Sequence, residues 1–476
     1  MKRTIKILLI LLTTVSFFSC KKFLDVQPED KVSESQLYST KNGIRSVLNG
    51  IYLDLAANQL YGDNLTLSTI EILGQRYNIS TEHNQYKTST YAYKDKPTVD
   101  RMEDIWSAAY STILNINVFL ENLDKYKGVL DQSTENVYRG EAIAMRAFLH
   151  FDLLRLYGPR YSTVDSTKQS LPYYRNTKTE VNPLLPANDF IDNVMADLNL
   201  AETLLQNDPI ITTGVNIAQP EDLVDFLSNN RNYRLNYYAI KGLKARVYLY
   251  RGDKANALTT AKEVIAISGK FPWTTSANAL VEKQNPDRVF SSEMLFGVMN
   301  SQLYNRYLNW FDPSLSDRQI LAPTPSRLAT VYENNENDYR YNLNWQMPSN
   351  GSKPYKTFLK YADVVDKTRT FRFSIPLLKI SEIYYIAAEC EPNAADGITL
   401  LNIVRANRGL LPLTTTVNIS TELQKEYQKD LFGEGQLFYY YKRRNVTSVA
   451  NGSSTSGNVT INYNVPLPDS ESIYRQ

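Results

Sequence analysis

Two tryptophans, Trp310 and Trp345, lie in stretches rich in tyrosine, asparagine and arginine. The whole chain is also rich in tyrosine, with 34 among its 476 residues. An aromatic face can cover the apolar C–H face of a sugar ring while nearby amide and charged groups bond its hydroxyls. The sequence therefore allows sugar recognition by stacking, with Trp310, Trp345 and the neighbouring Tyr307 and Tyr341 as candidate ligand-binding residues. For both tryptophans, packing inside the fold is an equally open alternative.

Catalytic chemistry has little support in this sequence. The chain has no Gly-x-Ser-x-Gly, Gly-x-Gly-x-x-Gly, Walker or His-Glu-x-x-His motif. Of its two histidines, we expect His83 to be solvated in a polar loop and His150 to be packed in a helix. Two carboxylate pairs could in principle flank a glycosidic bond: Glu389 with Glu391, and Asp430 with Glu434. We expect these pairs to be structural, and we predict that the protein is not an enzyme.

The composition excludes other classes of function. Lys+Arg 52 against Asp+Glu 50 gives a net charge of +2, which provides no basic surplus for a nucleic acid. Two histidines and two cysteines leave too few ligands for a typical metal site or a disulfide framework. We therefore expect no metal, cofactor or nucleic acid. The 43% hydrophobic residues predict a large buried core.

The first 20 residues have the pattern of an export signal. Lys2, Arg3 and Lys6 form a basic start, and the 13 uncharged residues 7–19 are too few for a membrane span of about 20 residues. Ser19-Cys20 resembles the end of a bacterial lipobox, where the cysteine becomes the first mature residue and carries acyl chains. We predict a signal peptide over residues 1–19, lipid attachment at Cys20 and a polar tether over residues 20–35. An unmodified thiol after ordinary signal cleavage is the alternative.

Helical periodicity dominates the first half of the chain. Apolar residues at i, i+3, i+4 and i+7 predict a helix over residues 40–55, with Thr40 as its N-cap. The same spacing predicts a helix capped by Asp100, another over residues 137–157 and a third starting near Asn188. Residues 236–270 resemble one tetratricopeptide repeat, with two helices around the turn Arg251-Gly252-Asp253. A lone repeat cannot bury its apolar face, so we expect other helix pairs to stack on it.

The second half is less regular. Residues 272–372 have no sustained helical period, so we expect loops, short helices and a hairpin around residues 339–361. Helices then return, with one starting at Pro376, one over residues 399–409 and one over residues 420–444 that is interrupted at Gly433-Glu434-Gly435. We predict an all-α dominated fold, a superhelix of tetratricopeptide-like hairpins with a loop-rich, ligand-facing part and at most small β-hairpins. Its parts form a single domain over residues 36–476: a helical scaffold (36–271), a variable part (272–372) and the returning helices (373–476).

Seven segments occur in a characteristic order. They are Cys20-Lys-Lys-Phe-Leu-Asp-Val-Gln-Pro, Arg146-Ala-Phe-Leu-His-Phe-Asp-Leu-Leu-Arg-Leu-Tyr-Gly-Pro159, Ala245-Arg-Val-Tyr-Leu-Tyr-Arg-Gly-Asp253, Leu378-Lys-Ile-Ser-Glu-Ile-Tyr-Tyr-Ile-Ala-Ala-Glu389, Leu401-Asn-Ile-Val-Arg405, Leu431-Phe-Gly-Glu-Gly435 and Val465-Pro-Leu-Pro468. In this order the chain resembles the SusD/RagB-like family of outer-membrane nutrient-binding lipoproteins. The residues after Gly435 depart from the family pattern, which indicates a divergent branch.

The resemblance implies a cell-surface lipoprotein of the outer membrane. Such a protein would bind oligosaccharide or another small nutrient and pass it to a SusC-like TonB-dependent transporter, on whose extracellular mouth it sits as a lid. The resemblance also places ligand contacts in the early loop, where Arg76, Tyr77 and Asn78 become further candidates. Anchoring of that loop, or contact with the transporter, is the alternative role for its tyrosines. A periplasm-facing tetratricopeptide-type lipoprotein that scaffolds outer-membrane assembly is the alternative function.

Overall fold

The computed structural model describes residues 33–215 and 227–475. The predicted signal peptide, Cys20 and most of the predicted tether lie outside these residues. The described chain begins at Ser33, whose side chain accepts from the N–H of Gln36 and caps helix α2 (Glu34–Tyr38). Helical structure thus starts inside the segment predicted as a tether.

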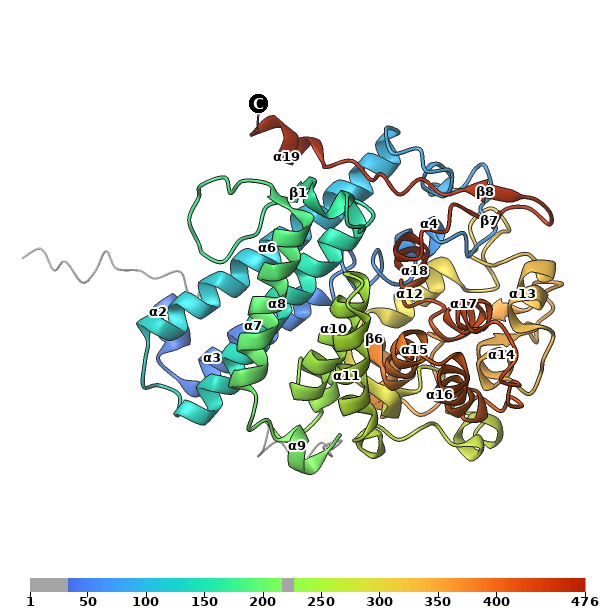
Figure 1. Cartoon of the computed structure of the whole chain (residues 1–476). Coiled ribbons are helices and arrows are strands. Elements are labelled where there is room, and N and C mark those ends of the chain that lie inside the picture. The colour runs from blue at the N-terminus through green and yellow to red at the C-terminus, as the bar shows by residue number, and fades with distance from the viewer. Residues whose placement is uncertain (1–32, 216–226, 476) are drawn as a thin grey trace, which may run out of the picture.

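Long helices packed side by side make up the N-terminal half of the molecule (Figure 1). The Thr40 side chain accepts from the N–H of Gly43 at 3.0 Å, which confirms the predicted N-cap of α3. Each of the first five of these helices packs on the one that follows it in the list below. They are α3 (Lys41–Leu55), α6 (Lys96–Lys125), α7 (Gln132–Tyr157), α8 (Ala187–Leu204), α10 (Tyr237–Tyr250) and α11 (Lys254–Ile265).

The start of α6 differs from the prediction. This helix begins at Lys96, one turn before the expected cap Asp100. Pro97 lies in its first turn, where backbone N–H groups have no partner within the helix, so proline costs no hydrogen bond there. Asp100 instead pairs with the amine of Lys96 at 2.8 Å, one turn away. The expected cap therefore stabilises the first turn from inside the helix.

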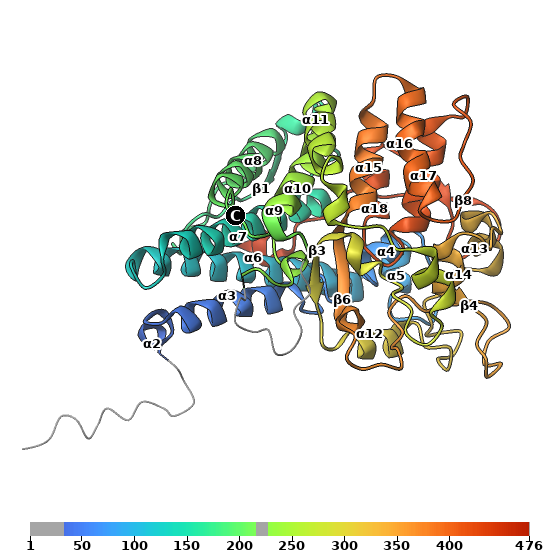
Figure 2. The same cartoon turned by 90° about the horizontal axis from the view of Figure 1, so that it is seen from below.

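The helical hairpins form one continuous stack, although a long segment of the chain separates α11 from the next helix of the stack. Helices α10 and α11 form the predicted hairpin, and α11 packs against α15 (Ile380–Cys390), which is more than 100 residues later. The stack continues through α16 (Ala394–Ala406) and α17 (Ile419–Asp430). Figure 2 shows α11, α15 and α16 along one side of the molecule and the intervening elements on the other. The residues between α11 and α15 thus form an insertion between two parts of the helical stack.

A two-stranded sheet lies in this insertion and ends directly before α15. Strand β3 (Met294–Met299) pairs antiparallel with β6 (Ser374–Lys379), directly before α15. The prediction of a helix start at Pro376 was wrong, because this residue lies in β6 opposite Gly297, where the register shifts. Proline is tolerated at such an irregularity. The partner strand lies about 80 residues away in sequence, so local periodicity could not show the pairing.

The remaining elements are short. The predicted hairpin near residues 339–361 is confirmed as β4 (Trp345–Gln346) with β5 (Thr357–Phe358). The other strand pairs are β1 (Gln169–Leu171) with β2 (Leu185–Pro186), and β7 (Ser448–Ala450) with β8 (Asn458–Thr460). The short helices are α4 (Thr69–Leu73), α5 (Tyr86–Ser89), α9 (Ile210–Thr213), α12 (Leu303–Trp310), α13 (Pro325–Tyr332), α14 (Tyr339–Asn344), α18 (Leu437–Arg443) and α19 (Asp469–Ile473). The fold is therefore dominated by helix with small antiparallel strand pairs, as predicted.

One connected cluster of buried apolar side chains runs from Tyr38 to Val465. It joins the helical stack to the insertion between α11 and α15. In the part of the chain that the structure describes, no helix combines the length and apolarity needed to cross a membrane.

Candidate functional site

Trp310 lies at the end of α12, where its ring is partly exposed. Its indole N–H donates to Oδ2 of Asp63 at 2.9 Å, and Nη1 of Arg306 lies 4.0 Å from the same oxygen. Arg101, on α6, interacts electrostatically with Asp63, and His83 packs against the indole with ring centroids 6.0 Å apart. We call these five residues the Trp310 cluster. They bring an aromatic ring, a carboxylate and two guanidinium groups to one place.

Several polar atoms of the Trp310 cluster have unused bonding capacity. Oδ1 of Asp63 and Nε of both Arg101 and Arg306 are buried and have no hydrogen-bond partner among the described residues. Burial raises the pKa of Asp63, and the Ser68 hydroxyl, the Trp310 N–H and the two arginines offset that effect only in part. Buried polar atoms are normally paired, so these three atoms are an unusual feature beside a partly exposed ring.

His83 is buried, which corrects the expectation of a solvated side chain. Only 8% of the residue is exposed. Its Nδ1 accepts from the N–H of Gln85 at 3.0 Å, so the proton lies on Nε2, which faces the carbonyl of Gln319 at 3.2 Å. Desolvation lowers the pKa of His83. The neutral ring of His83 therefore packs against the indole of Trp310 and helps to hold it in place.

The loop that carries Asp63 is fixed by the C-terminal part of the chain. Carboxylate oxygens of Glu71 accept from the N–H groups of Gly433 and Gly435, each at 2.9 Å. A Cβ on Gly435 would lie 1.8 Å from the carbonyl oxygen of Leu65, two residues after Asp63. Only glycine permits this approach, since Gly435 also has φ +68°. The turn between α17 and α18 thus positions the carboxylate of the cluster.

Two other candidate residues lie near the cluster. Tyr307 is one helical turn before Trp310, is buried, and stacks on the more exposed Tyr304 at 5.9 Å. The side chain of Asn78 is exposed, and its backbone N–H donates to Ala322, beside Leu321, whose N–H donates to the carbonyl of Trp310. The structure therefore brings Trp310, Tyr307 and Asn78 into one region.

Trp345 and Tyr341 lie inside the protein. Trp345 is 1% exposed, and its ring lies 4.9 Å from those of both Phe358 and Phe432. Tyr341 stacks on Tyr332 with centroids 4.9 Å apart and is 6% exposed. A ring enclosed in this way presents no free face, so these placements favour the packing alternative.

Arg76 and Tyr77 are also enclosed. Arg76 pairs with Glu71 at 3.1 Å and donates to the carbonyl of Tyr427 at 3.3 Å. The Tyr77 hydroxyl donates to the carbonyl of Leu67 at 2.9 Å. Both side chains therefore hold the early loop in place, and of the three early-loop candidates only Asn78 faces solvent.

The carboxylate pairs considered for catalysis are neutralised by cations. Glu389 binds Arg443, and Glu391 binds Lys262. Glu434 binds Lys360 and Lys379, and Asp430 binds Arg408. Burial alone would raise the pKa of Asp430, but Arg408, Lys379 and Arg340 outweigh it and hold that pKa well below its usual range. A general acid needs the opposite shift.

His150 is packed as expected. It is fully buried in α7 and stacks on Tyr173 with centroids 3.8 Å apart. Its Nε2 accepts from the N–H of Tyr174, so Nδ1 donates to the carbonyl of Arg146 at 2.9 Å. Within the described ranges, no group of three or more His, Cys, Asp or Glu side chains is placed to hold a metal ion.

Sequence reasoning missed Asp63, Arg101 and Arg306. Arg306 was the easiest of the three to find, because it lies four residues before Trp310 and shares its helical face. Asp63 follows α3 in a turn where its carbonyl accepts from Leu67 at 2.8 Å, and nothing in that local pattern points to Trp310.

Sequence comparisons relate this chain to one family. Residues 22–216 match a SusD-like family model described as starch-binding and associating with the outer membrane. The chain is 22% identical to the SusD-like protein P38 of Formosa agariphila over 92% of this chain and 90% of the relative. A SusD-like protein of Bacteroides ovatus is 24% identical over 62% of this chain and 47% of the relative.

Solved structures share the fold. A SusD superfamily protein from Bacteroides thetaiotaomicron superposes with a TM-score of 0.71 at 19% identity, covering 91% of this chain and 98% of that protein. A laminarin-binding SusD-like protein gives a TM-score of 0.60 at 18% identity, covering 85% and 92%. The family model and the relatives support assignment of this chain to the SusD/RagB-like family, and the solved structures share its fold.

Proposed function

We propose that this protein is a cell-surface, lipid-anchored binding protein that captures an oligosaccharide at the Trp310 cluster. The observation that carries the proposal is the partly exposed Trp310 ring, held by a hydrogen bond to Asp63 and lying beside the partly exposed Arg306. The ring offers a stacking surface, and the partly exposed guanidinium group of Arg306 beside it can bond sugar hydroxyls. The starch-binding description of the family model and the laminarin-binding structural neighbour are consistent with a carbohydrate ligand.

A glycan panel tests the ligand class. We expect at least one neutral oligosaccharide to bind the purified protein, and Trp310→Ala to weaken that binding by on the order of 1–3 kcal/mol, about the value of one large buried side chain. Trp273→Ala is the matched control, because Trp273 is also partly exposed but packs on Tyr384 at 5.4 Å. Absence of binding to every glycan, or equal loss in both variants, would contradict a stacking site at Trp310.

The proposal also includes transfer of the ligand to a SusC-like TonB-dependent transporter and anchoring through acylated Cys20. Cys20→Ala should release the protein from the membrane fraction without unfolding it. Pull-down from detergent-solubilised outer membranes should recover a large β-barrel transporter, and proteases added to intact cells should reach the protein. Protection from protease, with recovery of barrel-assembly components alone, would favour the periplasmic scaffold.

A further inference from the structure

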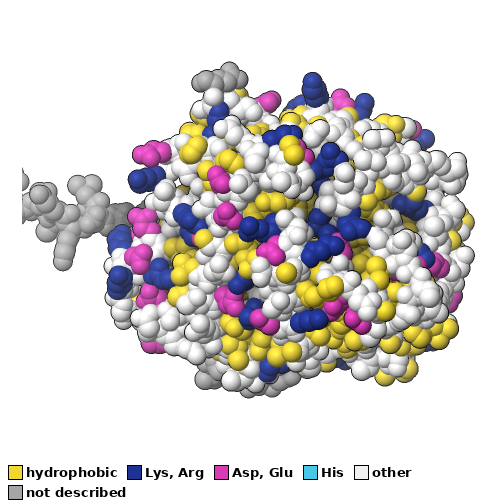
Figure 3. Space-filling view, in the orientation of Figure 1, with side chains coloured by type: hydrophobic (Ala, Val, Ile, Leu, Met, Phe, Trp, Pro, Cys, Tyr) yellow, Lys and Arg dark blue, Asp and Glu magenta, His cyan; other side chains and the backbone are white. Residues whose placement is uncertain are grey.

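A basic hollow lies away from the Trp310 cluster. It has a volume of about 540 Å³, which is within the usual range of small-ligand sites, roughly 300–1,000 Å³. Its walls come from residues 161–166, the turn between α10 and α11, and the ends of α15 and α18. We call it the α10–α18 basin. Figure 3 shows Lys and Arg side chains gathered between α10 and α18 on this face.

The charges of the α10–α18 basin are unbalanced. Its lining includes four cationic side chains and one carboxylate: Arg251, Lys254, Arg443, Arg444 and Glu389. Nη1 and Nη2 of Arg443 donate to the carboxylate of Glu389, at 2.6 and 2.7 Å. Nη1 of Arg444 donates to the same carboxylate at 3.1 Å. Among the described residues, the side chain of Arg251 forms an ion pair with the exposed Asp192, at 3.2 Å. Lys254 is exposed, and its amine makes no hydrogen bond or ion pair with the described residues, although its charge contributes to lowering the pKa of Glu389. Positive charge therefore remains available to a ligand.

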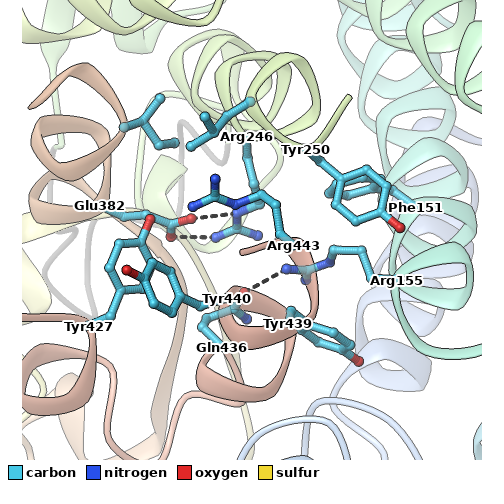
Figure 4. Close-up of a pocket in the computed structure, with 12 residues that line it drawn as sticks. Phe151, Arg155, Arg246, Tyr250, Glu382, Tyr427, Gln436, Tyr439, Tyr440 and Arg443 are labelled. Atoms are coloured by element: carbon cyan, nitrogen blue, oxygen red, sulfur yellow. Dashed lines mark hydrogen bonds and ion pairs between the residues drawn. The ribbon is translucent and has the colours of Figure 1, made fainter. Parts of the chain in front are cut away.

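The inner wall of the basin is rigid. Arg443, Tyr250 and Leu249 also line a chamber of about 30 Å³ (Figure 4), which has room for a water molecule or two but not for a sugar. In this chamber Arg246 is clamped by Glu382 through two bonds, at 2.7 and 2.6 Å. The basin is thus the only one of the two spaces that a saccharide could enter, and its wall is already ordered before binding.

The basin also offers a ring and hydroxyl groups. Tyr161 is partly exposed and packs on Tyr250 with centroids 5.5 Å apart. Three hydroxyl side chains between residues 162 and 166 share the lining. An aromatic ring beside hydroxyls suits a sugar, and guanidinium and ammonium groups suit an oxyanion.

We propose that the α10–α18 basin binds a saccharide that bears an oxyanion, either a carboxylate or a sulfate. This proposal extends the proposed carbohydrate capture to a second site and a second ligand class. Figure 2 places α11 and α12, which border the basin and the Trp310 cluster respectively, on opposite sides of the molecule. The two sites can therefore be tested separately.

Calorimetry on the full-length protein in detergent tests the basin. The probes are a galacturonate trisaccharide, a sulfated galactan oligosaccharide and the neutral galactose trisaccharide. We expect one of the anionic probes to bind more tightly than the neutral one. The double variant Arg251→Gln/Lys254→Gln should weaken that binding about tenfold or more, the usual value of a charge-assisted hydrogen bond. Lys127→Gln is the control, because Lys127 is exposed beyond the end of α6, among residues that do not line the basin.

Three outcomes would overturn the proposal. One is equal affinity for the anionic and neutral probes, and another is unchanged affinity in the double variant. The third is loss of anionic binding in Trp310→Ala, which would assign that ligand to the Trp310 cluster and leave the proposed function intact. Conversely, loss of neutral-glycan binding only in Trp310→Ala, with anionic binding retained, supports two separate sites.

Discussion

The indole of Trp310 and the carboxylate of Asp63 are joined by a 2.9 Å hydrogen bond across 247 positions of the sequence. The bond fixes the orientation of the ring while the ring stays partly exposed. Asp63 is 5% exposed and its pKa is raised by burial, so its ionised form costs folding free energy at neutral pH. A charge held at such a cost is typical of functional sites.

Asp63→Asn should separate binding from stability. The amide oxygen can still accept from Trp310, but the negative charge beside Arg306 and Arg101 is lost. We expect glycan affinity to fall by about 1.5–3 kcal/mol, the usual value of hydrogen bonds to a charged group, because the charge that holds the Arg306 guanidinium beside the ring is gone. The melting temperature should stay the same or rise, because the desolvated charge is removed. Calorimetric titration and thermal unfolding of the variant measure both, and a large loss of stability with unchanged affinity would make Asp63 a structural residue.

The two candidate tryptophans should respond in opposite ways. Trp345→Ala leaves a cavity among Phe358 and Phe432 and should lower the free energy of unfolding by roughly 3–5 kcal/mol. Trp310→Ala removes a partly exposed ring. It should lower the free energy of unfolding less than Trp345→Ala does, and it should weaken glycan binding more. Urea unfolding and glycan titration of both variants provide the comparison. Similar losses of stability would mean that Trp310 is also a packing residue.

Much of the helical scaffold could be predicted from local pattern. Thr40 and the periodic apolar residues after it defined α3, and residues 236–270 defined the α10–α11 hairpin. In such helices, neighbours at i+3 and i+4 decide burial, so the sequence carries the signal directly. The prediction of a helix start at Pro376 failed because the strand that pairs with this residue is distant in sequence. The pairing of β3 with β6 outweighs the local preference for a helix start.

The candidate site could be predicted only in part. Trp310 and Trp345 follow similar runs of tyrosine, arginine and asparagine, yet one is partly exposed and the other is in the core. Packing against Phe432, which is far away in sequence, decides the difference. Asp63 and His83 likewise join the cluster through contacts that no local spacing encodes.

Gly435→Ala should disturb the Asp63 loop from a distance. The new methyl group would meet the carbonyl oxygen of Leu65, and φ +68° is itself unfavourable for alanine. We expect a loss of at least about 1–2 kcal/mol of stability, together with weaker glycan binding. Gly457→Ala is the matched control, because Gly457 has φ +84° with open space around it. If both variants lose the same stability and neither loses affinity, the Leu65 contact does not position the site.

The stability of the protein should depend on pH through His150. Burial lowers the pKa of His150 to about 3, against 6.5 for an exposed histidine. Between these values the unfolded chain binds a proton that the folded protein excludes, so the free energy of unfolding falls as the pH falls from 6.5 towards 3. Over the whole window the loss from this residue is on the order of 5 kcal/mol.

His150→Gln provides the reference for this pH effect. Glutamine can keep a hydrogen bond to the backbone of α7 or of Tyr174 but does not titrate. Urea unfolding from pH 7 to pH 4 should show the native protein losing stability relative to the variant as the pH decreases. NMR of the two histidine rings gives an independent readout, since the His150 signals should not titrate above pH 4. A His150 resonance that titrates near pH 6.5 would show that its ring is open to solvent and would contradict the packing described for α7.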